Sequence, residues 1–284
     1  MHKKLIRCII AACSFLTINS SLALAQLNPS DEAQGITETA YTPLRCNQQL
    51  QASRQKTYSR KFIVPQQARL LSWNIYKAQN QGLYKDLTHL NETADIVLLQ
   101  EAIVDTRLTS LKPFWRFSPG YKSGNVQSGV MTLSRWPATV HCTFIHKEPW
   151  LRSPKATNIV EYAMANQQRL LSVNLHGINF TFGTKAYAQQ LQASIKIMQQ
   201  HKGPILFAGD LNAWSDARQK LVNDALSKLG LKEAIYVDDK RTKAFGLALD
   251  QVWARGVVIS DTLVSEYTSS DHNPILATLK VDDV

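Results

Sequence analysis

The feature that most constrains the fold is an alternation of short apolar runs with amphipathic stretches, which begins near Arg69 and continues to the C-terminus. Apolar runs bounded by turn-forming residues are typical of strands, and apolar residues at helical spacing are typical of helices that cover a sheet. The pattern predicts strands at residues 68–75, 94–102, 128–137, 138–146, 169–177, 178–183, 204–210, 249–256 and 273–281, and helices at 83–91, 187–200 and 216–229. Strands that alternate with helices indicate an α/β or α+β layered domain.

Two segments of the chain resemble each other closely. Residues 69–75 read RLLSWNI and residues 169–175 read RLLSVNL. A repeat this short can arise by chance. It can also mark two related halves, each of which contributes strands to its own sheet.

The N-terminus has the pattern of a secretory signal peptide. A basic start is followed by the apolar run CIIAACSFLTI and by the small-x-small sequence Ala23-Leu24-Ala25, which predicts cleavage after Ala25 and a periplasmic or secreted protein. The apolar run is short for a membrane span, and an uncleaved N-terminal anchor is the alternative. Residues 26–60 are rich in Gln, Thr and Ser and predict a polar arm, which leaves residues 61–284 as the folded domain.

Net charge and cysteine content bear on the cellular compartment of the protein and on the class of partner that it binds. The net charge is +10, and about +7 remains without the basic signal segment, which suits a polyanion such as nucleic acid or an anionic lipid; plain solubility is the alternative. The mature chain keeps Cys46 and Cys142, which could form one disulfide in an oxidising compartment, although the sequence does not show that they lie close together. No feature indicates a protein partner, so we expect a monomer.

Acids, amides and histidines stand at the ends of separate predicted strands. They are Asn74, Glu101, His176, Asp210, Asn212, Asp250, Asp271 and His272. One such residue alone is explained by a turn or a helix cap. Because buried ionised groups need partners, so many at strand ends indicate one shared pocket. Oxygen ligands without clustered cysteines favour Mg²⁺, with Mn²⁺ or Ca²⁺ as alternatives, over zinc.

These residues lie in motifs that carry a family resemblance. The segments WNI, LLQEA, NLHGINF, GDLNAW, LDQVW and SSDHNPI follow one another from about Arg69 to the C-terminus. In this order they resemble the endonuclease/exonuclease/phosphatase family, also called DNase-I-like. The segment EPWLRSPKAT at residues 148–157 is also similar to its YafD-like bacterial branch. The resemblance implies a four-layered α/β sandwich, in which two central mixed sheets are flanked by helices and the site lies at their shared edge.

The resemblance also implies a ligand set for a divalent metal ion. Glu101 would be the main ligand, Asn74 would stand next to it, and Asp271 would add a ligand directly or through water. Two cations near the predicted pocket, Arg152 and Lys155, could hold a substrate phosphate, with solvated loop charges as the alternative.

The remaining site residues receive catalytic roles from the same resemblance. Asp210 and Asn212 would orient the attacking water and a phosphate oxygen. His272 would act as a base or a phosphate contact, oriented by Asp250, and His176 matches a second histidine of the nuclease and sphingomyelinase branches. Whether the general base is a histidine or an aspartate stays open.

The sequence therefore predicts a secreted, divalent-metal-dependent phosphodiesterase, and a nuclease that cleaves DNA or RNA in particular. The first rival is a lipid or inositol phosphodiesterase or phosphatase of the sphingomyelinase type. Such enzymes often carry an exposed apolar hairpin for the membrane, and the sequence shows no clear loop of that kind. The second rival is a binding module that has lost catalysis, against which the retained acids, amides and histidines argue.

Overall fold

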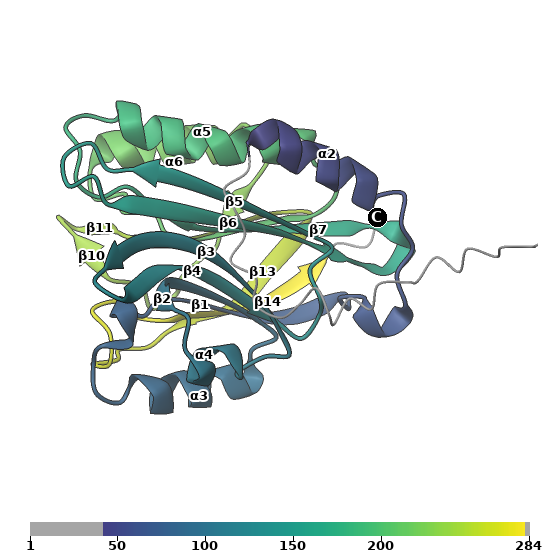
Figure 1. The fold of residues 1–284 in the computed structure, drawn as a ribbon, viewed down its shortest axis with the longest axis horizontal. Coiled ribbons are helices and arrows are strands. Elements are labelled where there is room, and N and C mark those ends of the chain that lie inside the picture. Colours follow the sequence, from purple (N-terminus) through teal and green to yellow (C-terminus); the bar gives the residue numbers. More distant parts are fainter. Residues whose placement is uncertain (1–41, 282–284) are drawn as a thin grey trace, which may run out of the picture.

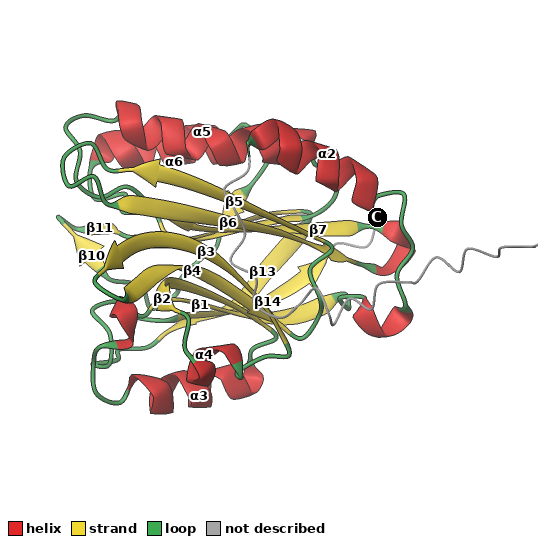
Figure 2. Ribbon diagram, viewed as in Figure 1, coloured by secondary structure: helices red, strands yellow, loops and turns green. Residues whose placement is uncertain are grey.

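The protein is a sandwich of four layers, as a computed structural model that describes residues 42–281 shows. Two six-stranded sheets in this part of the chain face each other, and helices cover their outer faces (Figure 1). Helices α2 (Pro43–Ser53), α5 (Lys185–Gln200) and α6 (Asp216–Ser227) lie on one side, and α3 (Leu83–Thr93) and α4 (Thr106–Thr109) on the other (Figure 2). The predicted fold class is confirmed.

The two sheets have the same strand pattern. The first runs, in spatial order, β13 (Val257–Val264), β14 (Ile275–Val281), β1 (Gln67–Asn74), β2 (Ile96–Ile103), β4 (Val126–Ser134) and β3 (Phe114–Ser123). The second runs β5 (Val140–Lys147), β6 (Pro154–Ala163), β7 (Arg169–His176), β8 (Ile205–Asp210), β12 (Asp250–Arg255) and β9 (Lys232–Glu233). A small hairpin, β10 (Lys243–Ala244) and β11 (Leu247–Ala248), and three 3₁₀ turns, η1 (Arg60–Phe62), η2 (Tyr76–Ala78) and η3 (Ala165–Gln167), complete the described elements.

Each sheet contains one central parallel pair among its named strands. β1 pairs with β2 and β7 pairs with β8 in parallel, whereas the neighbouring pairs are antiparallel. The similar segments RLLSWNI and RLLSVNL form β1 and β7, which take equivalent places in the two sheets. The asparagine near the end of each segment has different contacts. Asn174 accepts a 2.7 Å hydrogen bond from Gln100 between the sheets, whereas Asn74 donates to Asp210.

Apolar side chains fill the space between the sheets. Leu70, Leu98 and Ile275 from the first sheet belong to one cluster with Val160 and Leu206 from the second. Full burial of such a side chain contributes about 2 kcal/mol relative to an exposed position. This core holds the two sheets in a fixed relation, so strand ends from both can build one site.

Part of the predicted polar arm belongs to the folded domain. Helix α2 begins after Thr42, whose hydroxyl accepts a hydrogen bond from the backbone N–H of Arg45, and Pro43 takes its first position. Cys46 and Leu50 are buried on its inner face, and Cys46 forms a disulfide with Cys142 of β5 at a Cα–Cα distance of 5.7 Å. The predicted signal peptide at residues 1–25 lies outside the described residues.

Several predicted elements differ from the structure. Residues 178–183 form a loop rather than a strand, because Phe180 and Phe182 are exposed and the backbone N–H groups of Asn179 and Phe180 donate to the carboxylate of Glu148. The pattern also missed β3, β6 and β13, whose polar and apolar residues do not alternate cleanly. No helix among residues 42–281 has the length and apolar character needed to cross a membrane.

Candidate active site

The carboxyl ends of the two parallel strand pairs bring most of the predicted site residues together. Asn74 ends β1, Glu101 lies late in β2, and His176 and Asp210 end β7 and β8. The register pairs Asp210 with His176 on one side and with Asp250 of β12 on the other, so these three residues are direct cross-strand neighbours. Strand pairing therefore places polar groups from distant segments at one edge of the sandwich.

Asp210 is the centre of the hydrogen-bond network. Its Oδ2 accepts hydrogen bonds from the side-chain amides of Asn74 at 3.0 Å and Asn212 at 3.1 Å, and its Oδ1 accepts one from the Asn212 backbone N–H at 3.0 Å. Burial raises the pKa of Asp210 to about 6, and the negative charge of Asp250 adds to this while His272 opposes it. Asp210 is thus a carboxylate whose pKa lies near neutral pH.

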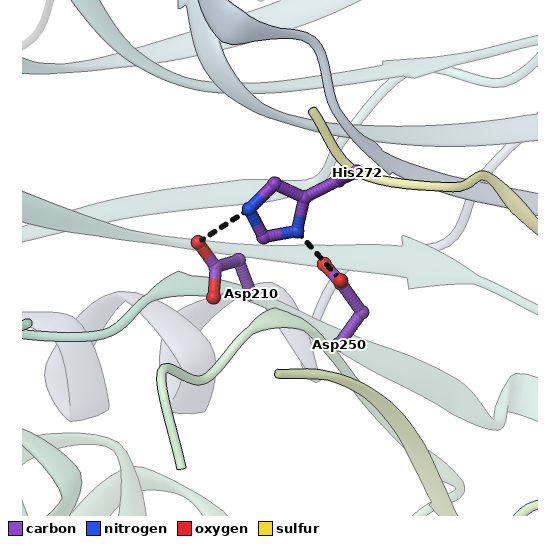
Figure 3. A group of neighbouring side chains, drawn as sticks. All are labelled: Asp210, Asp250 and His272. Atoms are coloured by element: carbon purple, nitrogen blue, oxygen red, sulfur yellow. Dashed lines mark hydrogen bonds and ion pairs between the residues drawn. The ribbon is translucent and has the colours of Figure 1, made fainter. Parts of the chain in front are cut away.

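His272 lies between two carboxylates (Figure 3). Its Nδ1 is 2.7 Å from Asp250 Oδ2, and its Nε2 is 3.9 Å from Asp210 Oδ2. Burial opposes the charged ring, but Asp250 and Asp210 outweigh burial and raise the pKa of His272 to about 10. The ring is therefore an imidazolium at neutral pH, with Nδ1–H donating to Asp250 and Nε2–H on the side of Asp210.

His176 is buried to a similar degree but has a different neighbour. Lys155 Nζ lies 2.9 Å from His176 Nε2, while Asp210 Oδ2 is 3.4 Å and Glu101 Oε1 is 3.9 Å from the same nitrogen. Burial, together with the positive charges of Lys155, His272 and Lys77, lowers the pKa of His176 well below its ordinary value. The neutral ring accepts a hydrogen bond from the Lys155 ammonium through Nε2.

Glu101 contacts a residue that the sequence did not single out. The ammonium of Lys77 forms an ion pair with Glu101 Oε2, and both side chains are only partly exposed. Lys77 and Glu101 both have left-handed backbone conformations, with φ of 56° and 50°. A lysine three residues after a strand-ending asparagine gives no signal in a single sequence, which is why it was missed.

A cavity of about 300 Å³ opens beside these residues. Its lining includes the less exposed Lys77, Glu101, Lys155 and His176 and the exposed Leu151 and Phe180. Of the two predicted phosphate-binding cations, Lys155 lines this cavity.

Two predicted residues lie away from this centre. Arg152 is exposed on a turn closed by its own backbone N–H, which donates to Glu148 O at 3.0 Å, and Arg152 does not line the cavity. Asp271 is exposed, and its carboxylate accepts a 3.4 Å hydrogen bond from Ser270 and raises the pKa of His272.

The cavity mouth carries exposed apolar side chains. Trp150, Leu151, Phe180 and Phe182 are each more than half exposed, and the rings of Trp150 and Phe182 meet with centroids 3.8 Å apart. The buried carboxylate of Glu148 joins the two loops, because it accepts hydrogen bonds from the Ser153 hydroxyl and from the Asn179 N–H. The sequence shows no clear apolar loop because two separate loops, neither of them apolar throughout, supply these exposed side chains together.

The donor set suits a hard divalent metal ion. Glu101 lines the open cavity, so one of its oxygens is accessible, and Asn74 Oδ1 accepts only a 3.1 Å bond from the Tyr76 N–H among its recorded contacts. Asp210, Asp250 and His272 also offer ligand atoms within 4.8 Å of one another. In this second group the His272 Nδ1 and an Asp250 oxygen are already 2.7 Å apart and engaged with each other in a hydrogen bond. Glu101 and Asn74 thus fit such an ion best.

The family can now be stated from comparison with known proteins. A sequence model of the endonuclease/exonuclease/phosphatase family matches residues 71–272. The chain belongs to this family. It is 36% identical over 223 residues to the UPF0294 protein of Vibrio campbellii, covering 75% of this chain and 78% of that relative. Such relatives agree with the resemblance to a bacterial branch of the family.

Solved structures of the family have the same fold. A family member from Bacteroides vulgatus covers 76% of this chain and 99% of its own, with a TM-score of 0.60 and 16% identity. A mannosyl-6-phosphatase from Bacteroides thetaiotaomicron covers 75% of this chain and 99% of its own, with a TM-score of 0.55 and 15% identity. Likeness at this level of identity concerns the fold alone, and members of one fold differ in substrate.

Proposed function

We propose that the protein is a divalent-metal-dependent phosphodiesterase and that its substrate is DNA or RNA. The observation that carries this proposal is that Asp210 lies between two histidines, the cationic His272 and the neutral His176. His176 lines a cavity together with Glu101 and Lys155. Phosphodiester hydrolysis needs a proton acceptor for water and positive groups around the phosphate. Asp210 and His272 offer both beside the cavity that His176 and Lys155 line.

The protonation states suggest a division of labour. Asp210 takes the proton from the attacking water, because its pKa near 6 leaves it ionised at neutral pH and still basic. The imidazolium of His272, held by Asp250, donates a hydrogen bond to a phosphate oxygen, and Asn212 holds the Asp210 carboxylate in place. We therefore propose the aspartate, rather than a histidine, as the general base.

Lys155 and the metal site would complete the charge balance. The Lys155 ammonium, which His176 orients, lines the cavity and is available to a second phosphate oxygen. A Mg²⁺ ion held by Glu101 and Asn74, with Asp271 near enough in sequence to His272 to add a water-mediated contact, would supply Lewis-acid stabilisation of the phosphate charge. Mn²⁺ or Ca²⁺ would suit the same oxygen donors.

Charge and compartment support nucleic acid as the substrate. The net charge of +10 favours an extended polyanion. The disulfide between Cys46 and Cys142 supports the predicted periplasmic or secreted location, because such bonds persist in oxidising compartments.

A lipid phosphodiester is the second candidate, and the apolar mouth favours it. Trp150, Leu151, Phe180 and Phe182 would enter the surface of an anionic or phosphocholine membrane, while the headgroup ester would reach the cavity. The same aromatic rings could instead stack on bases of a single strand.

A substrate panel separates these candidates. The purified protein would be given plasmid DNA, single-stranded DNA, RNA, sphingomyelin vesicles and inositol phosphates, each with Mg²⁺ and with EDTA. We expect Mg²⁺-dependent cleavage of a nucleic acid that His272→Ala abolishes while the protein stays folded. Cleavage of lipid alone, lost in Phe182→Ala but kept in the even more exposed control Val237→Ala, would replace the nuclease by the lipid enzyme.

A further inference from the structure

The turn that follows β1 has a strained backbone, and this turn positions the side chain of Lys77. Tyr76, Lys77 and Ala78 have φ values of 46°, 56° and 55°, although none of them is glycine. Left-handed conformations of this kind cost about 1–2 kcal/mol per residue. Strain that persists over three residues needs a compensating arrangement, and it often marks a functional segment.

Buried hydrogen bonds hold this turn against the site. The Tyr76 N–H donates to Asn74 Oδ1 at 3.1 Å, and the Ile75 N–H donates to Gln100 O at 3.0 Å. Glu101, on the other side, is itself left-handed and lies in the irregular part of the β2–β4 register. Two distorted segments thus bring the Lys77 ammonium onto the Glu101 carboxylate.

Lys77 is one of three cations among the carboxylates of the site. Lys77, Lys155 and the protonated His272 contact Glu101, His176 and Asp250, and the carboxylate of Glu148 also lines the cavity. A divalent ion on Glu101 would lie beside the Lys77 ammonium, and two positive charges this close to each other repel. The ion and the ammonium therefore compete for one carboxylate.

We propose that Lys77 is an exchangeable counter-ion of Glu101. Without a divalent ion, its ammonium neutralises the carboxylate and keeps the site assembled. When the ion binds, Lys77 leaves Glu101, and its flexible stem lets the ammonium bind an oxygen of the substrate phosphate in the cavity that Lys77 already lines. The inference rests on the proposed metal-dependent function and adds to it that metal binding frees a phosphate-binding cation.

The proposal predicts opposite effects of one substitution on two ligands. Lys77→Met keeps the unbranched stem and the backbone conformation but removes the charge. Titration calorimetry with MnCl₂, in the absence of substrate, should show binding that is tighter than wild type by about tenfold or more. With saturating Mg²⁺, the same variant should bind inorganic phosphate more weakly by about tenfold.

Lys85→Met is the matched control, because Lys85 is an exposed lysine of α3 outside the cavity, and both affinities should equal those of wild type. A variant that merely misfolds would lose affinity for both ligands and would show a lower melting temperature. Equal or weaker Mn²⁺ binding by a folded Lys77→Met protein would overturn the role of Lys77 while the proposed function stands. If neither wild type nor Lys77→Met binds Mn²⁺, the proposed metal-dependent function fails as well.

Discussion

The two histidines of the site, compared with each other, show how neighbours decide charge at equal burial. His176 is 6% exposed and His272 is 8% exposed, and both ring Nε2 atoms lie within 4 Å of the same oxygen of Asp210. Burial lowers the pKa of both rings, yet His272 is held protonated by Asp250 whereas Lys155 helps to keep His176 neutral. The site therefore has a cationic half and a neutral half around one carboxylate.

The difference in charge between His272 and His176 gives the two histidines separate roles. An imidazolium can bind and protonate oxygen atoms, whereas a neutral imidazole that accepts from a lysine through Nε2 orients that lysine and has no proton on Nε2 to give. Asp210, between them, is the group whose proton affinity suits transfer near neutral pH. Four substitutions test this comparison, in order of decreasing expected effect.

Asp210→Asn removes the carboxylate that both halves share. Because the proposed proton acceptor is lost, the kcat for Mg²⁺-dependent diester hydrolysis should fall by about 10³-fold. Steady-state rates on the cleaved substrate, with circular dichroism as the folding control, measure this. A folded variant that retains a tenth of the wild-type rate would exclude Asp210 as the base.

Asp250→Asn should make His272 more like His176. Without the carboxylate on Nδ1, burial is opposed only by Asp210 and Asp271, so the pKa of His272 should fall from about 10, and kcat should drop by about 10²-fold. Imidazole chemical shifts as a function of pH report the pKa directly. An unchanged titration would mean that Asp250 does not stabilise the imidazolium.

The same variant has a pH-dependent effect on stability. The folded pKa of His272 lies above its ordinary value of 6.5, so its protonation contributes stability that is fully present below about pH 6.5 and is lost as the pH rises through about 10. The loss of unfolding free energy in Asp250→Asn should therefore be largest near pH 6 and should shrink toward pH 10. Urea unfolding at several pH values checks this, and a loss that grows with pH would contradict it.

Lys155→Met removes the cation from the neutral half. Without its repulsion the pKa of His176 should rise, although burial still holds it below 6.5, and the KM for substrate should increase by about tenfold through the lost phosphate contact. The exposed Lys85→Met is the control. A Lys155→Met protein with wild-type KM would remove Lys155 from the substrate site.

Asn212→Gly gives the smallest effect. Asn212 has a φ of 49°, which glycine adopts without strain, so the substitution removes the side-chain hydrogen bonds to Asp210 and to Gly177 O without straining the backbone. Losing a donor to the charged form raises the pKa of Asp210, and the acidic limb of the pH–rate profile should move to higher pH with a several-fold loss of rate at pH 6. A limb that moves to lower pH would contradict the assignment of Asp210 as the base.

The site residues that the sequence predicted are those that end strands. The run Pro204 to Ala208 predicts a buried strand, and the motif order then places Asp210 with His176 and Asp250, which the strand register explains. Residues at the ends of strands can be located from the sequence alone, because the regular strand pattern shows where each strand ends.

Features that depend on loop geometry could not be predicted from the sequence. Phe180 and Phe182 alternate like strand residues, yet hydrogen bonds to Glu148 hold them in an exposed loop. Lys77 depends on a left-handed turn of non-glycine residues, for which local propensity offers no sign. The two histidine charge states depend on distances between segments far apart in sequence, so they become visible only in three dimensions.

The most direct test of the account is a pH titration of both histidine rings by NMR in protein labelled with ¹⁵N-histidine and kept in EDTA. Signals are assigned from their loss in His176→Gln and His272→Gln. The account predicts that His272 stays protonated through neutral pH and titrates near 10, while His176 stays neutral over the same range. Two rings that titrate together near 6.5, or a neutral His272 at pH 7, would contradict it.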